Sequence, residues 1–207
     1  MARLYLVTPE KLDPVGFADP LSAALDAGDV AAVQLRLKGC DDKFIRNAVS
    51  ILRPMVQKRN AAFILNDHPD LAAETGCDGV HIGQQDVPYA EAREAVGPDS
   101  IVGVTCHDSR HLAIEAAEQG ADYVAFGAFF PTQTKEATGH PTSDILAWWT
   151  EVMVVPCVAI GGITPENVGQ VIAADFIAVC SGIWSHREGP AAAVKAYLSA
   201  IERAAKS

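Results

Sequence analysis

The loop at residues 132–135 carries hydroxyl groups at Thr132 and Thr134 and an ammonium group at Lys135. It comes shortly after an apolar run, residues 122–126. Hydroxyl and ammonium groups are suitable hydrogen-bond donors for phosphate oxygens. Taken alone, such a loop is more often an ordinary polar surface loop. It gains weight because several other polar clusters in this chain also follow apolar runs.

Two carboxylates, Asp67 and Asp86, follow apolar runs in the same way. A carboxylate pair without a Cys or His ligand set suits Mg²⁺, which often completes its shell with water and substrate phosphate. Arg36, Lys38 and Lys135 could then hold a diphosphate against the metal. The alternatives are two helix caps for the aspartates and solvated ion pairs for the cations, and the residues themselves leave both open.

Two further clusters, Gly161-Gly162 and Ser181-Gly182, suit a phosphate group. Glycine lets bare backbone N–H groups approach an oxyanion, and a helix N-terminus nearby adds a favourable dipole. The alternative is a tight turn that needs glycine. Among the histidines, His107 is a candidate for proton transfer at a strand end. His81 lies mid-strand and is expected to be a hydrogen-bonded interior residue.

Eight short apolar runs, each followed by a helical pattern, must position these groups. The predicted strands are residues 4–7, 31–35, 62–65, 79–82, 100–104, 122–126, 155–160 and 176–179. Such alternation requires parallel pairing with covered faces, and eight units close naturally into a (β/α)₈ barrel. An open doubly wound sheet is the runner-up, although no G-x-G-x-x-G follows the first strand. We predict one TIM-barrel domain over residues 1–207.

Two helix starts are predicted from cap signals. Asp19-Pro20 is expected to begin the helix after the first strand, and Thr164-Pro165 to begin a helix that runs to about Ala173. The C-terminal ends of barrel strands converge on one face, where active sites lie. Polar groups gather after the strands, whereas the segments between carry ordinary helix surface, and this asymmetry favours an enzyme.

The composition restricts the partners. Lys and Arg total 16 and Asp and Glu total 26, so the net charge of −10 argues against nucleic acid or an anionic membrane as the main partner. No signal peptide is recognisable, and no apolar run approaches the roughly 20 residues that span a bilayer. The five scattered cysteines are typical of reduced thiols in a cytoplasmic protein. The sequence leaves open whether the chain forms a homo-oligomer.

Five segments together resemble the thiamine phosphate synthase family: residues 34–38 (QLRLK), 66–67 (ND), 79–86 (GVHIGQQD), 127–135 and 159–163 (AIGGI). The resemblance runs in order from the first strand to the eighth. It implies a TIM barrel that joins hydroxymethylpyrimidine diphosphate to hydroxyethylthiazole phosphate, with Mg²⁺ as cofactor and these small molecules as substrates. In that family the pyrimidine C–O bond is thought to break first, so the site must neutralise the leaving diphosphate rather than supply a strong base.

The resemblance also implies roles for particular residues. The metal would be bound by Asp67 and Asp86, and the thiazole phosphate by Gly162 and Ser181. Gln34 would lie against the pyrimidine, and Thr105 would supply a hydroxyl where the family commonly has Ser. The diphosphate or the pyrimidine would be held by Arg36, Lys38, Asn66, Thr132, Thr134 and Lys135, with Arg36, Lys38 and Lys135 as the catalytic cations.

Three departures from the family pattern stand in this chain. His68 replaces the usual Arg, Thr105 replaces the usual Ser, and residues 171–175 look about two residues short.

Two rival functions remain at this stage. One is a thiazole tautomerase of the same superfamily, for which His107 would transfer a proton. The other is a non-catalytic phosphate-ligand sensor. The retained aspartates and the Thr-x-Thr-Lys loop favour the synthase.

Overall fold

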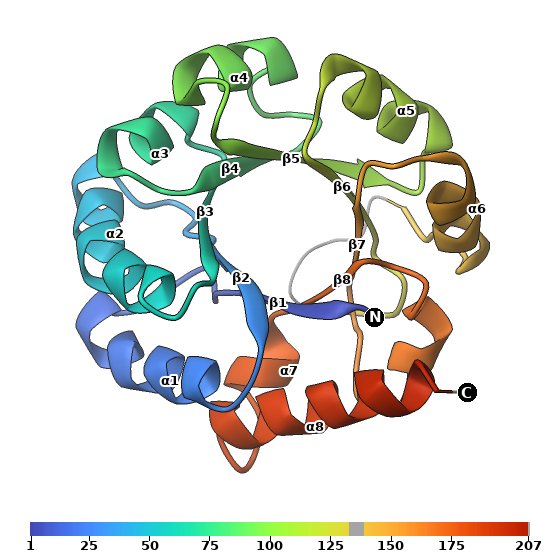
Figure 1. Ribbon diagram of the computed structural model, residues 1–207. Coiled ribbons are helices and arrows are strands. Elements are labelled where there is room, and N and C mark those ends of the chain that lie inside the picture. Colours follow the sequence, from blue (N-terminus) through green and yellow to red (C-terminus); the bar gives the residue numbers. More distant parts are fainter. Residues whose placement is uncertain (133–138, 207) are drawn as a thin grey trace.

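The computed structural model describes residues 1–132 and 139–206 of the chain. In this part of the chain eight parallel strands form a closed barrel in the order of the sequence. Looking down the barrel, the strands form an inner ring and the helices an outer one (Figure 1). The strands are β1 (Arg3–Val7), β2 (Val30–Leu35), β3 (Ala62–Asn66), β4 (Gly79–Ile82), β5 (Ile101–His107), β6 (Tyr123–Phe126), β7 (Cys157–Ile160) and β8 (Phe176–Val179).

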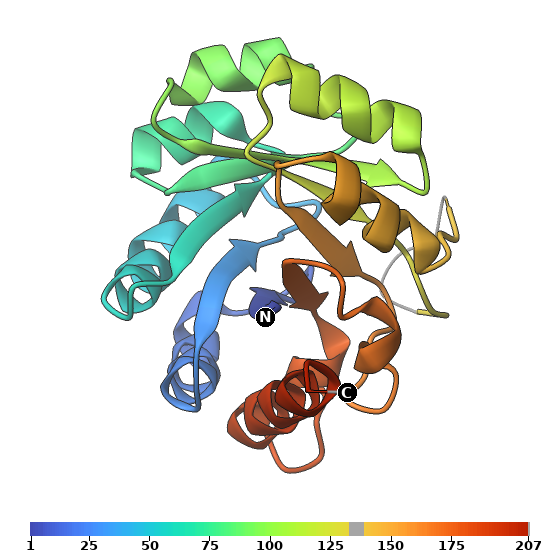
Figure 2. The same ribbon diagram turned by 45° about the vertical axis from the view of Figure 1, so that its right-hand side comes forward.

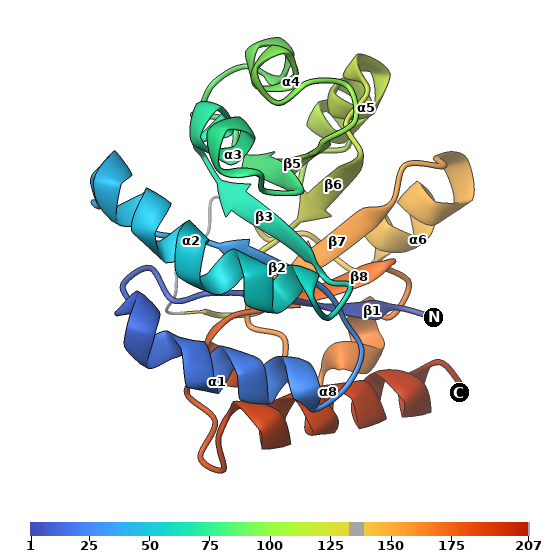
Figure 3. The ribbon, with the colours of Figure 1, turned by 60° about the vertical axis from the view of Figure 1, so that its left-hand side comes forward.

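The helical segments lie outside the strands, and Figures 2 and 3 show the same ring from two oblique directions. They are α1 (Pro14–Asp26), α2 (Asp42–Gln57), α3 (Pro69–Thr75), α4 (Tyr89–Val96), α5 (Arg110–Gln119), α6 (Asp144–Val152), the 3₁₀ helix η1 (Val168–Val171), α7 (Ser181–Trp184) and α8 (Pro190–Ala204). Helices α1 and α8 run side by side beneath the β1–β8 seam (Figure 3).

The apolar residues divide between two cores. The larger core fills the layer between the strands and the helices, with fully buried side chains such as Phe63, Phe126 and Trp149. The smaller core fills the inside of the barrel and includes Tyr5 and Tyr123. Successive strand residues point to opposite faces of a sheet, so one strand supplies both cores.

The predicted (β/α)₈ barrel is confirmed. The alternative of an open doubly wound sheet is wrong, because β1 pairs with β8 as well as with β2, and no edge is left unpaired between them. The pairing aligns Leu4 with Ile177 and Leu6 with Val179.

Two predicted helix starts are wrong. Helix α1 begins at Pro14, because Asp13 already supplies the cap by accepting a hydrogen bond of 2.8 Å from the Gly16 backbone N–H. Pro20 therefore lies inside the helix.

The segment after β7 is not the predicted helix from Thr164 to Ala173 but only the four-residue 3₁₀ helix η1. The Asn167 side chain bonds the backbone N–H of Thr164 at 2.8 Å and the carbonyl of Gly162 at 3.0 Å. These side-chain bonds favour a turn over the first turn of an α-helix.

No helix in the described part of the chain has both the length and the apolar character that crossing a membrane would need.

Candidate active site

A cavity of about 170 Å³ opens among the C-terminal ends of the strands, where barrel active sites lie. It is large enough for a ligand rather than for one or two waters, since one water needs about 10–15 Å³ on this measure. Seven residues predicted to bind substrate line it: Gln34, Arg36, Asn66, Thr105, Thr132, Gly162 and Ser181. These residues come from strand ends far apart in the sequence, and the closed barrel brings them around one space.

The floor of this cavity is polar because a chain of side chains joins five strands across the barrel interior. The Gln34 amide nitrogen donates to the Tyr5 hydroxyl at 3.1 Å, and the Tyr5 and Tyr123 hydroxyls lie 2.9 Å apart. Nδ1 of His81 lies 2.8 Å from the Tyr123 hydroxyl, and its Nε2 lies 2.7 Å from the Thr105 hydroxyl. We call Gln34, Tyr5, Tyr123, His81 and Thr105 the interior polar chain.

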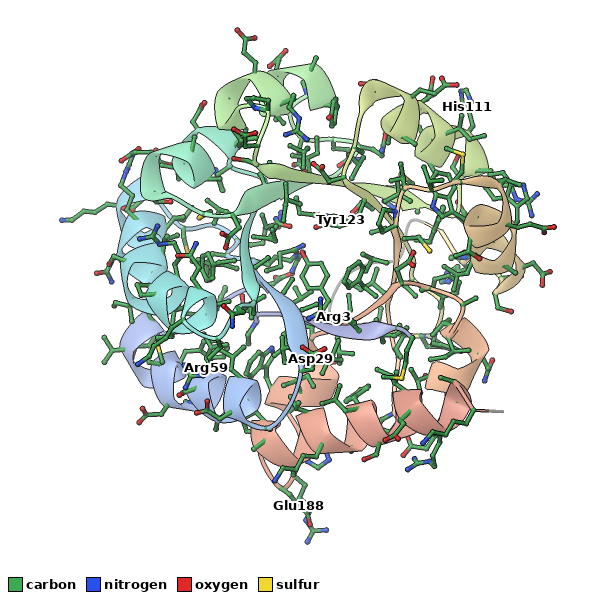
Figure 4. The ribbon with its side chains drawn as sticks, in the orientation of Figure 1. Arg3, Asp29, Arg59, His111, Tyr123 and Glu188 are labelled. Carbon is green, nitrogen blue, oxygen red and sulfur yellow. The ribbon has the colours of Figure 1, made fainter. Side chains whose placement is uncertain are left out.

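Burial extends the pH range over which the two phenols of this chain stay neutral. Desolvation raises the pKa of Tyr5 to about 12 and raises that of Tyr123 well above its ordinary value. Figure 4 shows Tyr123 inside the ring of strands. Its ring fits because β5 carries Gly103 there: a Cβ at Gly103 would lie 2.0 Å from the nearest atom of the Tyr123 ring.

Beside the cavity, the first residue after β3 is Asp67. Its backbone has φ = 66°, a left-handed conformation that Asp tolerates better than most residues, and its N–H donates to the His81 carbonyl at 2.9 Å. The Lys38 ammonium donates to the Asp67 carboxylate. Burial alone would raise the pKa of Asp67, but the bonds and charge of Lys38 and the contact with Asp86 hold that pKa below its usual range.

The neighbouring carboxylate, Asp86, shows the opposite shift. Desolvation raises its pKa, the Gly83 backbone N–H lowers it through a 2.7 Å bond, and the adjacent Asp67 charge raises it. Two carboxylates from the ends of β3 and β4 thus lie against one another with one ammonium group.

This donor set fits a magnesium ion. Among the described residues no group of three or more His, Cys, Asp or Glu side chains could hold a metal, so Asp67 and Asp86 would be its only acidic protein ligands there. That number is typical of Mg²⁺, which binds one or two carboxylates and takes its other ligands from water and phosphate. A cation between the two carboxylates would also relieve the repulsion that raises the pKa of Asp86.

The Arg36 guanidinium lies 2.5 Å from a carboxylate oxygen of Glu10, a residue of the loop after β1. The Arg36 side chain is only 13% exposed, and its backbone N–H bonds the Thr8 hydroxyl at 3.0 Å. Glu10 therefore holds the guanidinium at the cavity wall, and Thr8 holds the Arg36 backbone to the β1 end. The sequence did not indicate Glu10 as its partner.

The glycine pair after β7 shapes the opposite wall. Gly161 and Gly162 have φ = 103° and 62°, which glycine adopts without strain. A Cβ at Gly161 would lie 2.3 Å from that of Ala128, and a Cβ at Gly162 would lie 2.5 Å from the Pro131 carbonyl oxygen. The glycines thus let the segment after β6 pack directly on the β7 end. Ser181, which follows the neighbouring strand β8 and also lines the cavity, is the first residue of α7.

The predicted site residues fall into three groups. Seven line the cavity, while Lys38, Asp67 and Asp86 form the acidic cluster beside it. Thr134 and Lys135 lie outside the described residues. His107 lines the cavity with a left-handed φ of 54°, and its carbonyl accepts the Gly127 N–H at 3.0 Å. His81 is 7% exposed and hydrogen-bonded at both ring nitrogens, which confirms the prediction of an interior histidine.

Sequence reasoning missed the tyrosines of the cavity floor. Tyr5 and Tyr123 stand in apolar strands, where the sequence predicts only strand residues. The available signal was the period-two alternation, which turns Tyr5 and Tyr123 toward the barrel interior, where they line the same cavity as His81 and Thr105.

A closed (β/α)₈ barrel with cations, carboxylates and paired glycines at its C-terminal face is typical of enzymes that act on small phosphorylated molecules. The family model for "Thiamine monophosphate synthase" matches residues 4–183. The chain belongs to this family.

Relatives along the whole chain agree. A thiamine-phosphate synthase from Rhodospirillum centenum is 66% identical over 194 residues, covering 93% of this chain and 94% of that protein. One from Hyphomonas neptunium is 46% identical over 207 residues, covering 97% and 94%. The solved thiamine phosphate pyrophosphorylase from Pyrococcus furiosus superposes with a TM-score of 0.84 at 29% identity, covering 98% of this chain and 96% of that one.

Proposed function

We infer that the chain is a thiamine-phosphate synthase, a transferase that couples hydroxymethylpyrimidine diphosphate with hydroxyethylthiazole phosphate and releases diphosphate. The observation that carries this is the identity of 66% to a thiamine-phosphate synthase over almost the whole chain. The comparisons support neither the tautomerase nor the phosphate sensor.

The roles of the residues are our proposal. Asp67 and Asp86 would hold Mg²⁺, because they are the paired carboxylates beside the cavity and each perturbs the pKa of the other. The bound ion would supply charge neutralisation for the departing diphosphate. Arg36 and Lys38 would bind the diphosphate oxygens, with Thr132, Thr134 and Lys135 from the loop after β6.

Lys38 has a second part in this proposal. Its ammonium group bonds the Asp67 carboxylate and so neutralises a charge that a metal ion would otherwise neutralise. If an ion held by Asp67 and Asp86 took over this neutralisation, Lys38 would be free to bind the diphosphate. The Lys38 side chain is 43% exposed, so this movement costs little desolvation.

The organic parts of the substrates would take the remaining groups. The pyrimidine would lie against Gln34 and Asn66, both nearly buried polar side chains of the cavity wall. The thiazole phosphate would lie at Gly162 and Ser181. Breaking the pyrimidine C–O bond places negative charge on the diphosphate and leaves a cation that the thiazole nitrogen traps. The protein's task is therefore to bind leaving-group charge and to place the nucleophile.

A coupling assay tests the function directly. Purified protein, both substrates and Mg²⁺ should give thiamine phosphate and diphosphate in equal amounts, and EDTA should stop both. A folded protein that binds the thiazole phosphate and gives no product would contradict the proposed reaction. Turnover that persists in EDTA would contradict only the metal.

A cytoplasmic location agrees with the reduced cysteines, all five of which are free thiols.

A further inference from the structure

The interior polar chain has a hydrogen for each of its bonds, and this fixes their direction. The Gln34 amide nitrogen can only donate, so the Tyr5 oxygen accepts from it. The other polar contact that the structure gives the Tyr5 hydroxyl is the Tyr123 hydroxyl, 2.9 Å away. If Tyr5 did not donate to Tyr123, its own hydrogen would be buried without an acceptor. A buried donor left without an acceptor keeps the full cost of its desolvation, so this arrangement is disfavoured.

The direction then passes along the chain. Tyr123 accepts from Tyr5 and must give its single hydrogen to Nδ1 of His81, 2.8 Å away. Nδ1 is therefore unprotonated, and the neutral imidazole carries its proton on Nε2. That N–H points at the Thr105 hydroxyl, 2.7 Å away, which accepts it.

The last hydrogen of the interior polar chain is that of the Thr105 hydroxyl. Because its oxygen accepts from His81, its hydrogen is directed away from the imidazole, and Thr105 lines the cavity. We propose that Tyr123 and His81 are positioning residues that make the Thr105 hydroxyl a fixed hydrogen-bond donor to the pyrimidine diphosphate. The acceptor on this ligand is a ring nitrogen or a phosphate oxygen. The proposal rests on the proposed function for the identity of the ligand, but not for the tautomer.

The surroundings leave the hydrogens little freedom to reverse. Tyr5, Tyr123, Gln34 and His81 are all less than a tenth exposed, so little of their surface is open to water. Both phenols are protonated at neutral pH, and burial raises their pKa further. The His81 and Tyr123 rings also stack, with centroids 5.5 Å apart and planes at 20°, which holds the imidazole in one orientation.

Nitrogen NMR of the histidine rings tests the tautomer without any substrate. The spectrum of ¹⁵N-histidine-labelled protein should show a neutral ring protonated on Nε2, assigned to His81 by its loss in His81→Gln. In Tyr123→Phe the donor to Nδ1 is gone, and the signal should move toward the Nδ1–H form. Tyr5→Phe is the matched control: it removes a hydroxyl from the same chain but leaves Tyr123 able to donate, so the Nε2–H form should persist. A wild-type ring protonated on Nδ1, or on both nitrogens, would overturn the proposal.

A double-mutant cycle tests the effect on the ligand. Thr105→Val should raise the KM for the pyrimidine diphosphate by about tenfold, the size of one hydrogen bond to a charged group. Tyr123→Phe should raise the same KM by up to that factor, and the KM for the thiazole phosphate should change by less than twofold in both. The double variant should lose no more than Thr105→Val alone, because Tyr123 acts through Thr105.

Losses that multiply in the double variant, or equal losses for both substrates, would show that Tyr123 acts only on the fold. Thr105→Ser should have the wild-type KM, since it keeps the hydroxyl that Thr105→Val removes. Analogues of the ligand separate the two acceptors: inorganic diphosphate should lose affinity in Thr105→Val only if a phosphate oxygen is the acceptor. If the protein gave no thiamine phosphate at all, the NMR result would still decide the tautomer.

Discussion

The Lys38 ammonium group donates a hydrogen bond to the Asp67 carboxylate, joining the residues just beyond β2 and β3. Asp86, just beyond β4, shares this environment, because the charge of Asp67 raises its pKa. One cation thus serves two carboxylates at the edge of the cavity. The first two predictions follow from this arrangement.

Asp67→Asn should abolish Mg²⁺-dependent turnover and leave the barrel folded. Asn tolerates the left-handed backbone of this position, with φ = 66°, better than Ala does, so the change isolates the lost charge. Turnover and circular dichroism are the measurements. Asp29→Asn is the control. Asp29 pairs with Arg3 at the N-terminal ends of β1 and β2, away from the cavity at the C-terminal ends (Figure 4). Undiminished turnover in Asp67→Asn would remove Asp67 from the site.

Lys38→Met should reduce stability in a pH-dependent way. The folded pKa of Asp67 is held below that of the unfolded chain, about 3.9, so the ionised carboxylate stabilises the fold above that pH. This contribution is lost as pH falls through the folded pKa. The stability difference between wild type and Lys38→Met should therefore be largest near neutral pH and shrink in acid.

Urea unfolding between pH 3 and pH 7 measures this difference. Lys43→Met, on the exposed face of α2, serves as the control and should show no such trend. A difference that stays constant down to the lowest pH would mean that Lys38 stabilises the fold through its packing.

Gly162→Ala should weaken binding of the thiazole phosphate and destabilise the fold. The new Cβ would lie 2.5 Å from the Pro131 carbonyl oxygen and 2.7 Å from that of Phe130, both backbone atoms that cannot move alone. Gly97→Ala is the control, since Gly97 also has positive φ but no atom within 4 Å. Isothermal titration with the thiazole phosphate should show the loss only in Gly162→Ala. Equal effects would attribute it to backbone strain.

Gly103→Ala should destabilise the barrel by about 1–3 kcal/mol, the usual cost of overfilling a core. Its Cβ would lie within 2.4 Å of three Tyr123 atoms, including the hydroxyl oxygen. Gly169→Ala, where the nearest atom lies at an ordinary 3.7 Å, is the control. Thermal unfolding checks the difference, and a Gly103→Ala protein as stable as wild type would mean that Tyr123 can be displaced cheaply.

Lys135→Ala should lower the rate of diphosphate release more than the affinity for the thiazole phosphate. The reason is chemical: an ammonium group neutralises charge that develops on the leaving group. Single-turnover release of diphosphate and titration of the thiazole phosphate measure the two effects, with Lys195→Ala on α8 as the control. Equal losses in both would place Lys135 elsewhere.

The fold could be predicted because the barrel repeats one simple signal eight times. The same regularity predicts which strand ends carry polar groups, and Gln34, Arg36, Asn66 and Thr105 line the cavity as this pattern indicates. What could not be predicted depends on contacts between distant strands. The pairing of Arg36 with Glu10 needs a loop conformation, and the bonds linking Tyr5 to His81 need the barrel to be closed.

Local competition explains the errors in the helices. Asp13-Pro14 and Asp19-Pro20 carry the same cap signal, and the sequence could not rank them. After β7, the Asn167 side chain bonds the Gly162 carbonyl and so favours a turn over an α-helix. The spacing of apolar residues along the sequence does not indicate such a side-chain contact.

The seam between β1 and β8 has a consequence for how the chain folds during synthesis. β1 leaves the ribosome before β8, its second partner, because Ile177, which aligns with Leu4, lies about 170 residues further along. Until β8 emerges, one edge of β1 presents unpaired backbone groups, and an open sheet edge invites pairing with other chains. Helix α1, which follows β1 directly, and the quick pairing of β1 with β2 would have to protect the nascent barrel during this interval.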